Sequence, residues 1–322
     1  MTIPARAHFC WIGHRLPWAY VFAALSAASR AGLAEVVLHH TDPLAQGPEL
    51  RALRVAGRVR LARLDPAALL VASGEALGLG DALLALYRRI ESPVMRCDVL
   101  RAAILHEQGG IYLDLDTITT ASLRPLLAAR QFVGTEFIVW PQAVRRSRSP
   151  LLWARHLGLD LMRKALCRLP RGWKTFRRVE HLYFRGVNNA VMGTEAQAPL
   201  MAAYLRAMTL VPAAGLRNAY ALGPDLLQAL VDGMPPEDLV VHAPDVFHPL
   251  PPRISELWFR CDPRATLDEI VGEQTRVAHW YASVHTRARV ALIDPAFVRA
   301  NRERQLYSAL VSASIDPLPG PA

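Results

Sequence analysis

Cysteines are few in this chain of 322 residues, and they lie far apart. No two of them form a CxxC pair, and none stands near histidines at the spacing of a zinc site. We therefore expect buried free thiols in a reducing compartment, with neither a disulfide framework nor a structural zinc. The four residues are Cys10, Cys97, Cys167 and Cys261.

Long apolar runs are also missing, since none reaches the roughly 18 residues that a membrane-spanning helix needs. Residues 16–29 are apolar and follow Arg15, as in a signal peptide. However, this segment has a proline near its start, carries Trp18 and Tyr20, and follows a strand-like run that signal peptides do not contain. These features predict a cytoplasmic protein, either free in solution or peripheral to the inner face of the plasma membrane.

Acidic residues are scarcer than basic ones, with 28 Asp and Glu against 37 Lys and Arg, a net charge of +9. The overall composition, 52% hydrophobic and 20% charged, is that of a globular protein without low-complexity segments. The charge is uneven, because residues 145–185 hold twelve basic residues and only two acids. This one stretch accounts for the whole net charge and predicts an acidic partner.

The basic stretch 145–185 leaves three interpretations open. It is a solvated helical insertion, or it contacts an anionic membrane surface that presents lipid-linked sugars, or it binds nucleic acid. Trp153, Trp173 and Phe176 lie among its arginines, and aromatic residues beside basic ones suit a membrane surface. Nucleic acid is the least favoured partner, because no recognition motif accompanies the charge.

Strand and helix patterns alternate over the first third of the chain. Apolar strand patterns occupy residues 7–12, 35–40 and 59–64, and helical spacing occupies residues 18–31. This alternation is typical of a parallel sheet covered by helices. We therefore expect an α/β fold with a mostly parallel central sheet, helices on both faces and a helical insertion.

Residues 92–116 are the most informative segment. A Ser-Pro pair predicts the start of a helix, and Gly109 with Gly110 predicts its end. The apolar strand that follows carries Asp114 and Asp116 at its carboxyl end. Ligands bind at that edge of open α/β sheets, so these two acids are candidates for a site.

The spacing of Asp114 and Asp116 predicts that both carboxylates point to one face of the strand. They would repel each other unless a cation lies between them, and Mn²⁺ or Mg²⁺ bound together with a diphosphate resolves the repulsion. On the preceding helix, Asp98 and Arg101 share a face. They form either a local ion pair or part of the site, with Asp98 accepting from a ribose hydroxyl and Arg101 neutralising phosphate or sugar charge.

The run SPVMRCDVLRAAILHEQGGIYLDLD at residues 92–116 and the opening HFCWIG at residues 8–13 carry a family resemblance. They resemble the glycosyltransferase family with a DXD-containing sugar-binding region. That family includes α1,6-mannosyltransferases, α1,4-N-acetylglucosaminyltransferases, capsular polysaccharide transferases and the glucosyltransferase domains of large clostridial toxins. The resemblance covers about residues 1–140 and implies a GT-A-like nucleotide-diphospho-sugar transferase fold.

The resemblance implies roles on the donor side of the site. Trp11 would stack on the nucleobase, and Tyr112 would flank the donor. Asp98 would hold the ribose or sugar, and Arg101 the donor sugar or diphosphate. The chain departs from the family at Cys97, where a serine is usual, and this change removes one hydroxyl contact.

The resemblance also implies a metal site. Asp114 and Asp116 would bind nucleotide and metal, with Asp116 the more direct ligand. His279 and Trp280 resemble the late loop that closes over the diphosphate and the metal, which makes His279 a third candidate ligand and Trp280 a donor contact. Ser283-Val284 stands where the family often has Ser-Trp, so the closing loop would be built differently here.

Candidates on the acceptor side have competing structural explanations. Asn188-Asn189 resembles the family's acceptor-side segment beyond the core sheet, or forms an ordinary turn. Gly223-Pro224-Asp225 begins a helix, for which Pro224 is sufficient reason, or brings Asp225 near the acceptor. His39 and His40 end a strand without a partner at ligand spacing, so a core or strand-edge role is favoured over a metal site.

These patterns predict the organisation of the chain as a single α/β domain. Residues 1–140 would form the nucleotide-sugar-binding core, and residues 141–187 a basic helical insertion. Residues 188–313 would form the acceptor-side and closing part of the same domain. Residues 314–322, with three prolines, would be a disordered tail.

The predicted function is metal-dependent, retaining transfer of a sugar from a nucleotide-diphosphate sugar, most simply a UDP-sugar. The acceptor would be a hydroxyl of a glycan or lipid-linked glycan. Asp116, Arg101, Asn189 and Asp225 are the candidate catalytic residues. Two alternatives are a haloacid-dehalogenase-like phosphatase, whose active site also starts with Asp-x-Asp after a strand, and a nucleotide-sugar-binding protein without catalysis. Against the phosphatase, its later lysine and terminal acidic pair are not evident.

Overall fold

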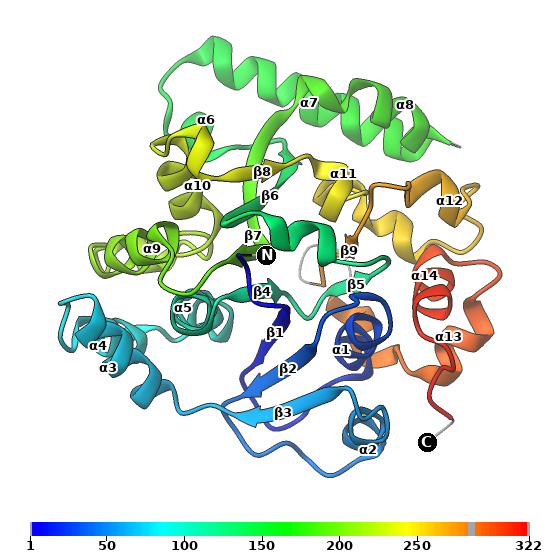
Figure 1. The fold of residues 1–322 in the computed structure, drawn as a ribbon. Coiled ribbons are helices and arrows are strands. Elements are labelled where there is room, and N and C mark those ends of the chain that lie inside the picture. Colours follow the sequence, from blue (N-terminus) through cyan, green and yellow to red (C-terminus); the bar gives the residue numbers. More distant parts are fainter. Residues whose placement is uncertain (1, 170, 283–286, 321–322) are drawn as a thin grey trace.

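The structure is a computed structural model that describes residues 2–169, 171–282 and 287–320 (Figure 1). Its centre is a seven-stranded sheet, to which a two-stranded sheet is added. In spatial order, the strands of the main sheet are β3 (Val59–Arg63), β2 (Glu35–His40), β1 (Arg6–Trp11), β4 (Gly110–Leu113), β7 (Phe184–Thr194), β6 (Gln131–Ile138) and β8 (Val240–His242).

Six of the seven strands run in the same direction. Strand β7 alone is reversed, and it pairs antiparallel with β4 on one side and β6 on the other. Strands β1, β2 and β3 lie where the apolar patterns predicted them, within one residue at each end. The predicted α/β fold with a mostly parallel sheet is therefore confirmed.

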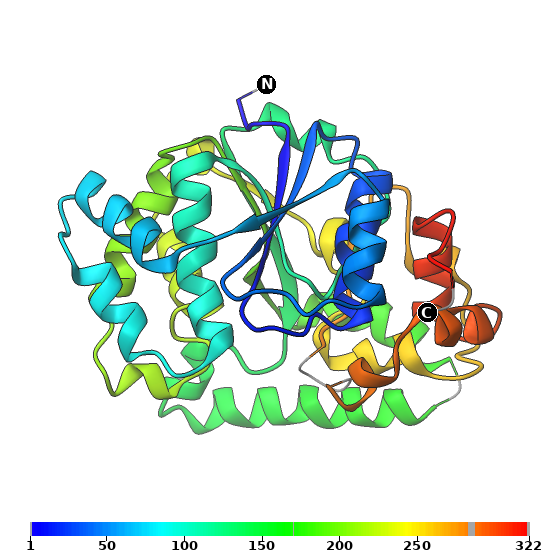
Figure 2. The same ribbon diagram turned by 90° about the horizontal axis from the view of Figure 1, so that it is seen from below.

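Helices cover both faces of the main sheet, as Figure 2 shows. On β1, Ala7 and Phe9 belong to one hydrophobic core with α1 and α14, whereas Cys10 belongs to a second core with α3, α4, α5, α9 and α10. The helices named so far are α1 (Trp18–Arg30), α3 (Pro66–Ala76), α4 (Ala82–Arg89), α5 (Pro93–Gln108), α9 (Pro199–Thr209), α10 (Pro224–Asp232) and α14 (Leu306–Ser314). The remaining helices outside the insertion are α2 (Pro48–Val55), α11 (Pro244–Phe247), α12 (Leu267–Ile270) and α13 (Pro295–Asn301).

Helix α5 ends where two consecutive glycines predicted its end. Gly109 and Gly110 have φ angles of 60° and 104°, which residues with a side chain rarely adopt. A Cβ on Gly110 would lie 2.8 Å from the carbonyl oxygen of Arg6, so the chain passes directly against β1 here. This close passage leads from α5 into β4 and thus to Asp114.

The small sheet joins two distant parts of the chain. Strand β5 (Thr117–Thr119) pairs antiparallel with β9 (Val277–His279), so that Thr117 lies opposite His279. Neither strand was predicted, because each has only three residues and a pattern that short cannot be told from a loop. This pairing brings the late histidine beside the Asp-Leu-Asp turn.

Three helices connect β6 to β7: α6 (Gln142–Arg146), α7 (Pro150–Arg168) and α8 (Gly172–Val179). They lie within the predicted helical insertion 141–187, although β7 already begins at Phe184. Helix α7 is the longest in the described chain and runs along the outside of the molecule (Figure 2). No helix among the described residues is both long and apolar enough to cross a bilayer.

Three predictions need correction. Asn188-Asn189 is neither a turn nor a segment beyond the sheet, because both residues lie within β7. The predicted disordered tail is wrong at residues 314 and 315, since Ser314 ends α14 and Ile315 is buried. The cysteines are free as predicted, but Cys261 is exposed, so not all four are buried.

Candidate functional site

Asp114 and Asp116 lie in a turn at the carboxyl end of β4, not on the strand itself. Strand β4 ends at Leu113, and β5 begins directly after Asp116. The prediction that strand alternation sets both carboxylates on one face is therefore wrong, because the chain turns at Leu115. The two acids are nevertheless brought together by this turn.

His279 reaches the Asp-Leu-Asp turn through the β5–β9 pairing. Its Nε2 lies 2.9 Å from Oδ1 of Asp116, and the backbone N–H of Ala282 donates to Oδ2 of the same carboxylate at 2.8 Å. The backbone N–H of Trp280 also donates to the carbonyl oxygen of Asp116. Asp116 is thus held at three atoms by residues more than 160 positions away in the chain.

Asp114, Asp116 and His279 could together hold a metal ion. One ligand atom from each lies within 4.8 Å of the others, and no other such group of histidine, cysteine and acidic residues occurs in the described parts of the chain. Two carboxylates and one imidazole form a donor set that Mn²⁺ accepts. The residues therefore fit the divalent metal ion that the sequence predicted.

The electrostatics of the pair formed by Asp116 and His279 favour charge on both groups. Burial acts to raise the pKa of Asp116, but the neighbouring His279 and the N–H of Ala282 outweigh it and lower the pKa. Burial acts to lower the pKa of His279, but Asp116 outweighs it and raises the pKa. A cation bound here would replace the proton that this pairing favours on His279, because a ligating ring nitrogen must be deprotonated.

Asp114 is held differently, because burial raises its pKa to about 7 despite the opposite charge of Arg101 nearby. The Arg101 guanidinium donates to both carboxylate oxygens, at 2.7 and 3.3 Å. Asp116 adds a repulsive charge that raises the Asp114 pKa further. A cation between the two acids would relieve this repulsion.

Three residues predicted on the donor side, Asp98, Arg101 and Asp114, form one network with Asn189, which was predicted on the acceptor side. Arg101 donates to Asp114 and to the backbone carbonyl of Asn189, and it lies 3.4 Å from Asp98. The Asn189 side chain donates to Asp98 at 2.8 Å. Asp98 and Arg101 therefore do form an ion pair, but the pair extends from α5 to the Asp-Leu-Asp turn and is not merely local.

A register shift in β7 explains how two consecutive asparagines reach different partners. Met192 lies opposite Val133 of β6, but Asn188 lies opposite the next residue, Gly134. The intervening residues of β7 therefore bulge away from β6. Asn189 contacts Asp98, whereas Asn188 donates to Glu136 at 2.8 Å.

Two of the remaining donor-side candidates have clear surroundings. Tyr112 is buried, and its ring lies 4.8 Å from the guanidinium carbon of Arg101, a cation–π contact that supports the arginine. Trp11 ends β1 at the same edge of the sheet as Asp114 and is partly exposed. Its ring packs against Tyr20, and its indole N–H is buried without a hydrogen-bond partner in the described structure.

The side chains of Trp280 and Asp225 do not join the group around Asp116. The Trp280 side chain is completely buried and packs against Phe259 and Tyr307. It therefore has no exposed surface with which to make the contact with a donor that the sequence had predicted. Asp225 accepts from Gln142 and pairs with Arg145 at 3.1 Å, which ties α10 to α6. The two residues Ser283-Val284 lie outside the described residues.

Sequence reasoning missed a second buried acid, Glu136, in the middle of β6. The hydroxyl of Tyr281 donates to Glu136 at 2.6 Å, and Tyr281 has a φ angle of 58°, which is uncommon for a residue with a side chain. His248 is also buried, and its ring lies 5.4 Å from that of His279. The available signal was a single acid within the apolar run QFVGTEFI.

A family model described as "Glycosyltransferase sugar-binding region containing DXD motif" matches residues 73–133. This segment contains Asp98, Arg101, Asp114 and Asp116, and hence most of the buried network. No curated protein matches the chain. Residues 73–133 are therefore glycosyltransferase-like, and the GT-A-like arrangement implied by the resemblance agrees with the sheet and its covering helices.

Several solved structures are similar to the chain. The PaToxG glycosyltransferase is 12% identical and covers 73% of this chain and 70% of its own, with a TM-score of 0.42. The UDP-bound glycosyltransferase domain of the YGT toxin is 10% identical, with coverages of 75% and 80% and a TM-score of 0.43. Mouse xyloside xylosyltransferase 1 is 13% identical, with coverages of 85% and 96% and a TM-score of 0.45.

Proposed function

We propose that this chain is a metal-dependent, retaining glycosyltransferase that moves a sugar from a nucleotide-diphosphate sugar to a hydroxyl acceptor. The observation that carries the proposal is the group of Asp114, Asp116 and His279, because its ligand atoms lie within 4.8 Å of one another. Two of these residues belong to the segment that matches the DXD sugar-binding region. Arg101 stands directly beside the group, where donor phosphates would require positive charge.

Asp116 and His279 would hold a Mn²⁺ or Mg²⁺ ion, with Asp114 shared between the ion and Arg101. The ion supplies positive charge that stabilises the departing nucleoside diphosphate. Arg101 is fixed in place by Asp114, by Asp98 and by the Tyr112 ring, so it needs no rearrangement to face the donor. Both contacts of Asp98 are made by its Oδ1. Its Oδ2 has no hydrogen bond among the described residues and would accept one from a ribose or sugar hydroxyl.

Trp11 would hold the nucleobase by stacking on the part of its ring that is exposed. UDP-sugars are the first donors to test. In a retaining mechanism of this kind, the departing phosphate takes the acceptor proton, so no carboxylate base opposite the sugar is required. The acceptor would be a glycan or lipid-linked glycan in polysaccharide synthesis at the cytoplasmic face of the membrane, with Asn189 and Asp225 on the acceptor side.

The haloacid-dehalogenase-like alternative is less compatible with this geometry. Such a phosphatase needs its first aspartate free to attack phosphorus. Asp114 instead accepts two hydrogen bonds from Arg101, and burial raises its pKa to about 7. A protonated or arginine-bound carboxylate is a poor nucleophile at neutral pH.

The experiment is donor hydrolysis, measured as release of nucleoside diphosphate from UDP- and GDP-sugars with Mn²⁺. Removing a metal ligand should cost about 10²-fold in rate or more, so Asp116→Ala should be nearly inactive. Asp268→Ala changes an exposed acid on α12 and serves as the matched control. Equal rates for wild type and Asp116→Ala would refute the assignment.

Two further readouts separate the alternatives. Hydrolysis of a simple phosphate ester that needs Asp114 would favour the phosphatase. Metal-dependent binding of a nucleotide sugar without turnover of any donor in the panel would favour a binding protein. Binding is measured by thermal shift, since a ligand specific for the folded state raises the melting temperature by mass action.

A further inference from the structure

Large hydrophobic side chains are concentrated on the outside of the insertion. Half of the fourteen exposed ones in the described chain lie between residues 151 and 184. A soluble protein normally exposes such residues singly, so a concentration of this kind indicates a contact surface. The seven residues are Leu151, Trp153, Leu157, Leu161, Leu169, Leu182 and Phe184.

Helix α7 contributes four of these residues. Trp153, Leu157 and Leu161 follow one another at intervals of four, so they form one stripe along the helix. Their exposed fractions are 42%, 51% and 55%. His156 and Asp160, which border the stripe, are buried on the side of α7 that faces the protein. Trp153 partly packs on Trp140, whereas Leu157 and Leu161 are left exposed.

Every exposed charge between residues 141 and 185 is positive. The exposed basic residues are Arg145, Arg146, Arg148, Arg155, Lys164, Arg168, Arg171, Arg178 and Arg185. Both acids of this stretch are buried and turned to basic neighbours, with Asp160 paired to Arg163 and Glu180 to Arg177. The folded chain thus hides its few negative charges here and presents only positive ones.

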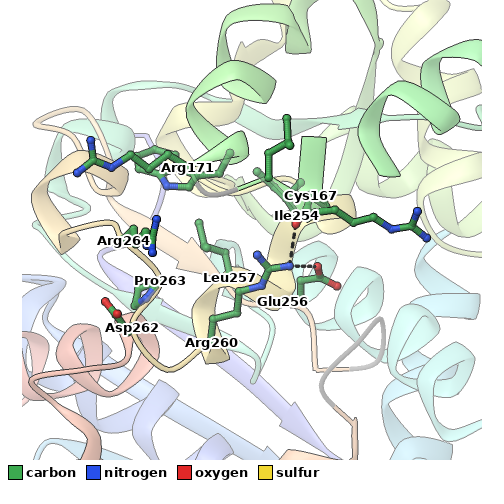
Figure 3. Close-up of a pocket in the computed structure, with 12 residues that line it drawn as sticks. Cys167, Arg171, Ile254, Glu256, Leu257, Arg260, Asp262, Pro263 and Arg264 are labelled. Atoms are coloured by element: carbon green, nitrogen blue, oxygen red, sulfur yellow. Dashed lines mark hydrogen bonds and ion pairs between the residues drawn. The ribbon is translucent and has the colours of Figure 1, made fainter. Parts of the chain in front are cut away.

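A pocket of about 280 Å³ continues this surface at the end of α7. Figure 3 shows the side chains of Arg171, Arg260 and Arg264 around it, together with two acids, Asp262 and the Glu256 to which Arg260 is bonded. Arg168 also lines the pocket, and neither it nor Arg171 nor Arg264 has an ion pair in the described structure. No predicted site residue lines this pocket, so it is separate from the Asp-Leu-Asp turn.

Helix α7 lies on the same side of the molecule as the donor site. His156 bonds to the carbonyl oxygen of Val139, and Trp153 packs on Trp140, so α7 is attached to the residues that directly follow β6. Asp114 directly follows β4, and both strands end at the same edge. Figure 2 shows α7 running along the edge toward which β1 points.

We infer that this surface, Leu151 to Phe184 with its exposed basic residues, docks on an anionic lipid bilayer. The apolar stripe of α7 would enter the boundary between headgroups and acyl chains, and the arginines would contact lipid phosphates. The pocket with Arg168, Arg171 and Arg264 would accept one headgroup phosphate. The inference rests on the proposed function. Docking would bring the sheet edge that carries the donor site close to a membrane, where a lipid-linked acceptor resides.

Other occupants fit the surface less well. Nucleic acid would use the arginines but would leave the leucine stripe exposed to water. A second copy of the chain would cover the stripe but would place nine positive charges opposite nine more. An anionic bilayer satisfies both features, because it offers acyl chains beside phosphate.

The test is co-sedimentation of the full chain with vesicles of phosphatidylcholine alone and of phosphatidylcholine with 30% phosphatidylglycerol. We expect binding to the anionic vesicles that weakens with added salt, and little binding to neutral ones. Leu157→Ser combined with Leu161→Ser should weaken binding about tenfold. Val55→Ser combined with Leu210→Ser removes exposed apolar side chains elsewhere and should change nothing.

Manganese-dependent donor hydrolysis in solution keeps this test separate from the proposed function, since the serine variants should retain it. Equal sedimentation of wild type and the Leu157/Leu161 variant would overturn the inference. A wild-type dimer, seen by light scattering, that becomes monomeric in the same variant would also overturn it. So would DNA binding at this surface together with equal binding to the two vesicle types.

Discussion

Each acid of the site is held by a polar partner, and the partner decides what the acid can do. His279 keeps Asp116 charged, whereas Arg101 binds an Asp114 whose pKa burial raises to about 7. Asp98 accepts a hydrogen bond from the side-chain amide of Asn189. Because these partners are themselves buried, the carboxylates are positioned before any ligand arrives.

Glu136 and Tyr281 fasten the segment that completes the metal site. The hydrogen bond from Tyr281 to Glu136 holds the backbone next to Ala282, whose N–H donates to Asp116. Tyr281→Phe removes this bond, so we expect manganese-dependent donor hydrolysis to fall about tenfold, the equivalent of one hydrogen bond. Steady-state kinetics at several Mn²⁺ concentrations should show a raised metal requirement.

The matched control for Tyr281→Phe is Tyr183→Phe, which removes a hydrogen bond of 2.8 Å to a carbonyl in the insertion. It should leave the metal requirement unchanged. If both variants behave alike, Tyr281 contributes only to stability and not to the geometry of the metal site.

Strands β1 and β2 are joined by a pair of neutral histidines. His8 Nε2 lies 2.9 Å from the carbonyl oxygen of Gly109, which can only accept, so this nitrogen carries the proton. His8 Nδ1 must then accept from His39 Nε2, also at 2.9 Å. The pair confirms that His39 is a core residue, as the sequence indicated, and it leaves no room for a further proton between the rings.

This histidine pair predicts that acid destabilises the fold. Burial lowers the pKa of His8 to about 3 and that of His39 to about 4, against about 6.5 in an unfolded chain. Below pH 6.5 the unfolded chain therefore binds protons that the folded chain does not, and stability falls with pH. At pH 5 each histidine should cost about 2 kcal/mol of unfolding free energy.

Urea unfolding at pH 7 and pH 5 measures this loss. His39→Gln keeps a side-chain N–H for His8 but cannot take up a proton, so its loss between the two pH values should be about 2 kcal/mol smaller. His181→Gln changes an exposed histidine and should follow the wild type. A wild-type stability that is flat from pH 7 to pH 5 would contradict the account of this pair.

The sequence predicted those elements whose patterns are local and long. Helix α5 runs from Pro93 to Gln108 as expected, because its cap, proline and glycines lie within the segment itself. Strands β5 and β9 were missed, since three residues carry no readable period and their pairing spans more than 150 positions. The bulge of β7 was missed for the same reason, as it depends on two neighbouring strands.

At the scale of the whole molecule, the donor side of the site could be predicted and the surroundings of its acids could not. The Asp-Leu-Asp turn, Arg101 and Asp98 share one short segment with a readable motif. Glu136 and Tyr281 come from separate segments that only the folded chain brings together. The same holds for the positive outer surface, since burial of Asp160 and Glu180 is not visible in the sequence.

The donor site follows the carboxyl end of β4, and α7 runs along the same edge of the sheet (Figure 2). A parallel sheet gathers its strand ends at one edge, so residues far apart in the chain share that edge. The arrangement would allow one orientation of the protein on a membrane to serve both donor and acceptor.

The central claim is that Asp114, Asp116 and His279 bind a divalent ion together with a nucleoside diphosphate. Calorimetric titration of Mn²⁺ into the chain in the presence of UDP tests it most directly. We predict one Mn²⁺ site, with an affinity that falls at least about tenfold in Asp116→Asn and in His279→Ala but not in Asp268→Asn. The claim is contradicted if all four proteins bind Mn²⁺ with the same affinity.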